Sequence, residues 1–260
     1  MQKLFITAAV AAMISGSAFA QEANLPVLSG EVSIDLAETT NDNYGATMGL
    51  ELGVNAGDLA TVDLNFTAVD GGAVTLDTWT VGTTVAGADI ALGDDNGVMP
   101  GAEGEQTLTA PAMAESVQVT MGGAAVAVGF DNWTTDVTDI SNVQGAYTFN
   151  VNNLALTVAA DHNLNTDNNV LGAGVAGLEL GLATLGGAMS YDVDAEVLGF
   201  EAVATTGGLT AYLNGTDSNT LQNVGGEYVY NYNGMELSAG ANYNVDTEDF
   251  APTVGVAFAF

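Results

Sequence analysis

The chain contains no cysteine and no arginine, and its only lysine is Lys3. Without cysteine it has no disulfide scaffold, thiolate metal site or cysteine nucleophile. Without an arginine or a second lysine it cannot clamp phosphates, neutralise nucleic acid or form an arginine–carboxylate ion pair. The 32 aspartate and glutamate residues bring the formal net charge to −31. This charge balance indicates a protein that attracts cations.

Residues 1–20 have the features of a secretory signal peptide. Lys3 gives the positive start, residues 4–14 form a short apolar core, and residues 18–20 read Ala-Phe-Ala, a small-x-small cleavage pattern. The apolar run is too short for a transmembrane anchor. We therefore expect a signal peptide at 1–20 and a single domain at 21–260.

The composition combines two properties that rarely occur together, because 48% of the residues are apolar although the net charge is −31. A disordered acidic chain is poor in apolar residues, and a soluble globule this acidic suffers strong self-repulsion. A protein that keeps its apolar and acidic residues on separate surfaces reconciles the two properties.

The sequence alternates in a way that creates two such surfaces. Val32, Ile34 and Leu36 fall on one face of an extended segment, and Glu31 and Asp35 fall on the other. This period of two predicts strands with one apolar and one polar face. The pattern returns at 46–54, 60–68, 154–158, 235–243 and 254–260.

Short Gly- or Asn-rich turns alternate with longer polar loops, and the connection at 94–113 is by far the longest. Outer-membrane barrels have this asymmetry. We predict an all-β fold, a closed transmembrane antiparallel β-barrel of sixteen strands with the long loop after the fifth strand. A barrel of fourteen strands is the alternative count, because fewer strands leave more residues for the connections. The Gly-rich region 170–191 is also compatible with two strands or four. The predicted strands are 28–37, 44–54, 59–68, 73–82, 86–93, 114–121, 123–132, 141–150, 153–162, 168–176, 178–191, 196–205, 208–214, 221–231, 234–244 and 252–260.

The alternative is a soluble or surface-attached acidic β-sandwich that binds calcium or structures the cell envelope, since sandwich strands also alternate. The signal peptide and the final Phe260 within an alternating strand favour the barrel. Aromatic residues near the expected strand ends favour it too, as an interfacial girdle would. They are Tyr44, Tyr147, Phe149, Tyr228, Tyr230, Tyr243, Phe258 and Phe260.

Four segments together resemble the Gram-negative general diffusion porins, in a short and acidic form. They are 87–93 before the long loop, 115–120, 125–130, and the terminal strand 254–260. The resemblance covers the whole mature chain in pattern and little of it in identity. It implies a water-filled outer-membrane channel for passive diffusion of small hydrophilic solutes. It also implies a homotrimer in outer-membrane lipid, and recognition of the terminal Phe260 by the barrel-assembly machinery.

In that family the loop after the fifth strand folds into the barrel and narrows the pore. The acidic residues that match it by position are Asp94, Asp95, Glu103 and Glu105. The family usually opposes such residues with an arginine cluster on the wall, and this chain has no residue for that role. The usual transverse field across the constriction is therefore not expected.

Acidic residues on the polar faces are expected to line the pore and to make it prefer cations, because rings of carboxylates select cations. They are Glu31, Asp35, Glu51, Asp63, Asp77, Asp161, Glu201, Glu227 and Glu236. Adaptation to a saline habitat predicts the same residues.

Asp161, Asn163, Asn165 and Asp167 space oxygen atoms as a weak calcium loop does. The run lacks the glycine of the sharp turn and has Gly172 at the twelfth position, so a plain polar loop is the other interpretation. No other cofactor is expected. The single histidine has no partners for a nucleophile–base pair or a metal site, so we do not expect an enzyme.

Overall fold

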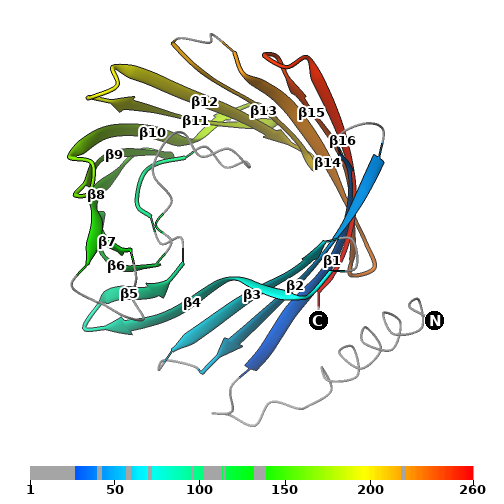
Figure 1. The fold of residues 1–260 in the computed structure, drawn as a ribbon, viewed down its shortest axis with the longest axis horizontal. Helices are drawn as coiled ribbons and strands as arrows, with labels where there is room; N and C mark the ends of the chain where they lie inside the picture. Colours follow the sequence, from blue (N-terminus) through cyan, green and yellow to red (C-terminus); the bar gives the residue numbers. More distant parts are fainter. Residues whose placement is uncertain are drawn as a thin grey trace.

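The computed structural model describes residues 27–39, 43–56, 60–69, 72–94, 97–101, 113, 115–131, 139–217 and 221–259. The predicted signal peptide, Asp95, Glu103, Glu105 and Phe260 lie outside these residues. Sixteen antiparallel strands form one sheet, in which β1 pairs with β16 and so closes a barrel (Figure 1). The strands are β1 (Val27–Thr39), β2 (Asn43–Asn55), β3 (Thr61–Val69), β4 (Thr75–Val85), β5 (Ala88–Gly93), β6 (Glu115–Met121), β7 (Ala124–Phe130), β8 (Ile140–Val151), β9 (Leu154–Asn163), β10 (Asn168–Leu180), β11 (Ala183–Asp192), β12 (Val197–Thr206), β13 (Leu209–Thr216), β14 (Asn223–Tyr232), β15 (Met235–Asn244) and β16 (Asp249–Ala259).

The predicted closed barrel and its sixteen strands are confirmed, and the long connection does follow β5. The β-sandwich alternative is wrong. A sandwich packs two sheets face to face, whereas here a single sheet returns to its first strand. Among the described residues, no helix has the length and apolar character needed to cross a membrane.

The largest difference from the predicted strand boundaries lies in the Gly-rich region. Residue 177, which separates two predicted strands, is instead part of a β-bulge inside β10, where the register with β11 shifts between Val175 and Leu178. Gly177 has φ +80°, and a Cβ there would lie 2.8 Å from the Asn153 carbonyl oxygen. A glycine at this position therefore accommodates the extra residue of the bulge. The chain reverses later, at residues 181–182.

One end of the barrel, which we call the turn end, has mostly two-residue connections. At 86–87, 207–208 and 233–234 both residues have positive φ, as a type I′ turn requires. At 122–123, 152–153 and 181–182 only the first residue does, as in type II′ turns. The twist of these turns matches the twist of the flanking strands, so the turns help to set the register of the hairpins.

At the opposite end, the loop end, three connections repeat one turn. Asn163 Oδ1 accepts the backbone N–H groups of Asn165 and Thr166, both at 3.0 Å. Asp192 and Asn244 make the same pair of contacts in the turns that follow β11 and β15. Each turn closes on an acidic residue with positive φ, namely Asp167, Glu196 or Glu248.

The outer face of the barrel is apolar. Large side chains alternate along the strands and remain exposed, among them Val158, Leu171, Met189 and Leu213. Outward aromatic residues gather near both ends. Near the turn end these are Tyr147, Phe149, Tyr228, Tyr230, Tyr232 and Phe258, and near the loop end Tyr191, Tyr243 and Phe250. The Tyr147 and Phe149 rings are stacked, with centroids 6.4 Å apart.

Replacing Gly208 with Ala should destabilise the barrel by about 1–3 kcal/mol, the usual cost of a strained backbone position. Gly208 has φ +87°, and an added Cβ would lie 2.5 Å from the Val229 carbonyl oxygen. The matched control is Gly207→Asn, which recreates the Asn-Gly pair found at 233–234 and meets no atom within 4 Å. Urea unfolding in lipid vesicles measures both variants. Equal destabilisation by the two would contradict this account of the turn.

Candidate functional site: the lumen and the inward loop

The inner face of the barrel carries small and polar side chains. Ser33 is paired with Gly49 on one side and with Ala257 on the other. A Cβ on Gly255 would collide with Asp35 Oδ1 and Ser238 Oγ, so glycine makes room there for polar groups. The buried polar residues all lie on this inner face, which encloses the lumen. They are Ser116, Asn142, Gln144, Asp161, Ser190, Glu201 and Asn214.

Six of the acidic residues predicted on polar faces share the inner face of β14, β15 and β1–β3, and we call them the acidic wall. Glu31 is paired directly with Glu51, and its charge is repelled by Glu51, Glu236 and Asp35. Asp35 is repelled in turn by Glu227 of β14. Residues 27–259 contain no lysine or arginine. The acidic wall therefore has no cationic partner on the strands. It consists of Glu31, Asp35, Glu51, Asp63, Glu227 and Glu236.

Two other predicted pore-lining residues occupy different environments. Glu201 lies on the inner face of β12, opposite Ala188 and Asn214, and is only 5% exposed. Asp77 is the extra residue of a β-bulge, because Thr78 pairs with Asn65 and Leu76 pairs with Phe66. The bulge interrupts the alternation from which the orientation of Asp77 was predicted.

The long loop leaves β5 through a fixed corner. Gly93 has φ +137°, and a Cβ there would collide with the Trp79 carbonyl oxygen. The Asp94 N–H donates to that oxygen at 2.8 Å, and Asp94 Oδ2 accepts the Trp79 N–H at 3.2 Å. Asp94 was predicted as a constriction residue, and the structure places its carboxylate at the base of the loop.

The described part of the long loop lies inside the ring of strands (Figure 1). Val98 and Met113 pack against Ala127 of β7, and Met113 and Ala127 are almost completely buried. The Val98 N–H donates to Gln144 Oε1 of β8 at 2.8 Å. Gln144 is 1% exposed, so this hydrogen bond joins loop and wall in a water-poor environment. The described residues of the loop therefore lie inside the barrel.

Further along, the loop rests on two glycines of β10. A Cβ on Gly172 would lie 2.8 Å from Met99 Cε and 3.0 Å from Pro100 Cδ, and one on Gly174 would lie 2.7 Å from Pro100 Cβ. The surface that receives the loop is thus built from alanine, glycine and an amide group. In the order of strands around the barrel, it lies across the lumen from the acidic wall.

The run predicted as a weak calcium loop is divided between a strand and a turn. Asp161 is buried on β9, where Oδ1 accepts the Asn142 Nδ2 group at 3.0 Å. Asn163 begins the repeated turn, and Asn165 Nδ2 donates to Asp131 Oδ2 at 2.7 Å. Asp167 supplies the residue with positive φ. The spacing that suggested a metal site is therefore the spacing of the repeated turn. The described residues contain no group of three or more Asp, Glu, His or Cys side chains that could hold a metal ion.

The residues that seat the loop were missed by the sequence analysis. Gln144, Ala127, Gly172 and Gly174 read as ordinary members of alternating strands. Only two signals mark them. Gln144 is an uncharged polar residue whose long side chain lies among mostly small side chains on the inner face. Gly172 and Gly174 are two positions apart and therefore lie on the same face of their strand. Neither signal identifies the loop as the partner.

Gln144→Leu should loosen the loop, because it leaves the buried Val98 N–H without an acceptor, at a cost of about 1–3 kcal/mol. Asn150→Leu on the same face and strand is the control, since Asn150 is exposed near the turn end. Hydrogen exchange of the Val98 amide should accelerate only in Gln144→Leu. Protection that is unchanged in that variant would show that Gln144 does not hold the loop.

The fold is shared with porins of known structure. A variant of the Rh. blastica porin superposes with a TM-score of 0.63 at 13% identity, covering 91% of this chain and 100% of that chain. A loop-deletion mutant of OmpT, an outer membrane protein of Vibrio cholerae, gives a TM-score of 0.54 at 11% identity, covering 92% of this chain and 100% of that chain. No protein-family model and no curated protein sequence matches the chain. At these identities the likeness concerns the fold alone.

Proposed function

We propose that this protein is an outer-membrane channel for passive diffusion of small hydrophilic solutes, with a preference for cations. The observation that carries the proposal is the sorting of side chains by the closed sheet. Exposed apolar residues face outward, together with the aromatic residues near the turn end and near the loop end, and the acidic wall faces inward. An apolar outer band between aromatic girdles suits lipid, and a polar interior suits water.

The cation preference follows from electrostatics. A carboxylate about 8 Å from a passing ion contributes roughly 0.5 kcal/mol in water. Three neighbouring carboxylates therefore favour a monovalent cation by roughly 1.5 kcal/mol before screening and disfavour an anion equally. Because the strands supply no lysine or arginine, mobile cations balance this charge, and the preference should weaken as salt rises.

Channel formation is tested by reconstitution in planar lipid bilayers. Stepwise increases in conductance are expected as single barrels insert, and liposomes that contain the protein should swell in isotonic solutions of small sugars. Incorporated and folded protein that gives neither conductance steps nor swelling would overturn the proposal.

The triple variant Glu31→Gln, Glu51→Gln and Glu236→Gln should lower the cation-to-anion permeability ratio at least about threefold in 0.1 M salt, because three lumenal charges are lost. The control removes three charges from the turns of the loop end, through Asp167→Asn, Glu196→Gln and Glu248→Gln. Zero-current potentials across a salt gradient measure both. If the control lowers the ratio as much as the lumenal variant, the selectivity does not originate at the acidic wall.

The resemblance to porins also suggests a homotrimer. We propose this assembly on that basis alone, and analytical ultracentrifugation of the detergent-solubilised protein tests it. A monomer under conditions that preserve the folded barrel would contradict it.

A further inference from the structure

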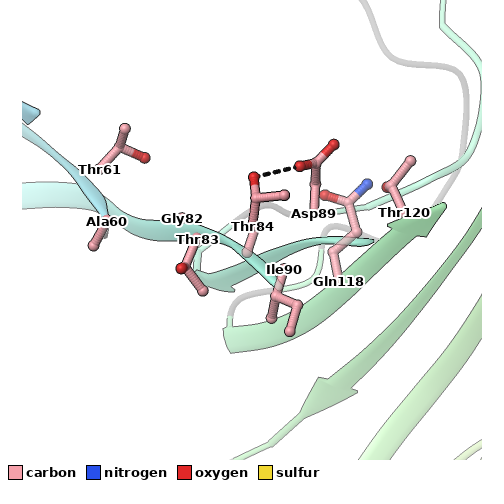
Figure 2. Close-up of a pocket in the computed structure, with 10 residues that line it drawn as sticks. Ala60, Thr61, Gly82, Thr83, Thr84, Asp89, Ile90, Gln118 and Thr120 are labelled. Atoms are coloured by element: carbon pink, nitrogen blue, oxygen red, sulfur yellow. Dashed lines mark hydrogen bonds between the residues drawn. The ribbon is translucent and has the colours of Figure 1, made fainter. Parts of the chain in front are cut away.

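A hollow of about 610 Å³ opens into the inner face of β3–β6, near the turn end. Figure 2 shows Thr61, Thr84, Asp89, Gln118 and Thr120 pointing to one side of the sheet, whereas Thr83 and Ile90 point to the other. The hollow belongs neither to the acidic wall nor to the seat of the loop. It is a separate group of polar side chains in the lumen.

Small residues at neighbouring positions form the floor of the hollow. Gly82 pairs with Thr61 on one side and with Ala91 on the other, and Ala91 pairs with Gln118. A Cβ on Gly82 would lie 2.7 Å from Thr61 Oγ1. Because Gly82 and Ala91 have small side chains or none, the space between the Thr61 hydroxyl and the Gln118 amide stays open.

A second row of polar groups forms the rim. Thr84 pairs with Asp89, which pairs with Thr120. Thr84 Oγ1 donates to Asp89 Oδ1 at 2.7 Å, which orients the carboxylate (Figure 2). Asp89 Oδ2 and the side chains of Thr61, Gln118 and Thr120 make no hydrogen bond within the described part of the chain. Their donors and acceptors are therefore available to a solute.

The polar groups around the hollow, on the rim and beside the floor, select among solutes. A carboxylate repels anions, and the hollow has no basic group to compensate. The Thr61 and Thr120 hydroxyls and the Gln118 amide can each donate and accept hydrogen bonds. The Thr84 hydroxyl already donates to Asp89, so it can only accept from a solute, as the carboxylate does. Adjacent strands lie about 4.8 Å apart, and alternate residues along a strand about 6.8 Å. The polar groups of the hollow are therefore spread over a distance that suits several hydroxyls distributed along a short carbon chain. A single cation holds its oxygen ligands at about 2.3–2.6 Å, so it could not contact all of these groups at once.

We propose that this hollow is a transient binding site for small uncharged polyols on their way through the lumen. The inference rests on the proposed channel function, whose solutes it specifies. Asp89 accepts hydrogen bonds from the solute. The other contacts come from Gln118, Thr120 and Thr61, and Gly82 and Ala91 leave the space that the solute occupies. Because every contact competes with water, half-saturation in the millimolar range is expected.

The test uses the full-length barrel in lipid nanodiscs and saturation-transfer difference NMR. The probes are glucitol and gluconate, which share a six-carbon skeleton and differ in that gluconate carries a carboxylate. A saturable signal is expected for glucitol and none for gluconate. Asp89→Asn should weaken glucitol binding about tenfold, as expected for a lost hydrogen bond to a charged group, and Ala91→Leu should abolish it by filling the floor. Asp249→Asn, which also removes one charge from the inner face, should leave glucitol binding unchanged.

Equal weakening by Asp89→Asn and Asp249→Asn would overturn the proposal, as would a non-saturable glucitol signal. Competitive displacement of glucitol by potassium would also overturn it and identify a cation site instead. Heat-dependent migration on denaturing gels verifies that each variant is folded, and Asp89→Asn carries the test if Ala91→Leu does not fold. Conductance of the same preparations separates the two hypotheses. Conductance without glucitol binding rejects the site alone, and absence of conductance rejects the channel.

Discussion

Closure of the sheet is the constraint on which the rest of the structure depends. When β1 pairs with β16, every strand has two neighbours, and no row of backbone N–H and C=O groups remains at an edge. Closure also turns the period-two alternation into an inside and an outside. A chain that is half apolar and carries a net charge of −31 can then place its apolar residues on one surface and its carboxylates on the other.

Two opposite sides of the lumen differ in composition and in what they contact. One wall carries Glu31, Glu51, Glu236 and their acidic neighbours without a basic residue among them. The other receives the inward loop through packing on Ala127, Gly172 and Gly174 and through one buried hydrogen bond to Gln144. Without an arginine, the described loop residues are held by close packing, by this hydrogen bond and by backbone geometry. Gly93 and Asp94 complete this arrangement by fixing the corner from which the loop departs.

The sequence was sufficient to predict the barrel, its strands and the long connection, because alternation is a local property that closure preserves. It was not sufficient where one residue is added or where distant segments meet. Asp77 lies at a bulge that shifts the phase of alternation, and Gly177 lies at another. The contacts of Val98 with Gln144 and of Pro100 with Gly174 join segments far apart in the chain, which no spacing rule connects. The oxygen-rich run after Asp161 was ambiguous, because an Asx turn and a cation loop use the same residue types.

We propose that uncompensated carboxylates inside a water-filled barrel control which ions pass. The most direct measurement is the zero-current potential of the unmodified protein in planar bilayers, under a fixed tenfold potassium chloride gradient at increasing mean salt concentration. We expect a potential with the sign of cation preference that decreases steadily as salt screens the charges in the lumen. A potential of the opposite sign, or one that does not depend on salt, would contradict it.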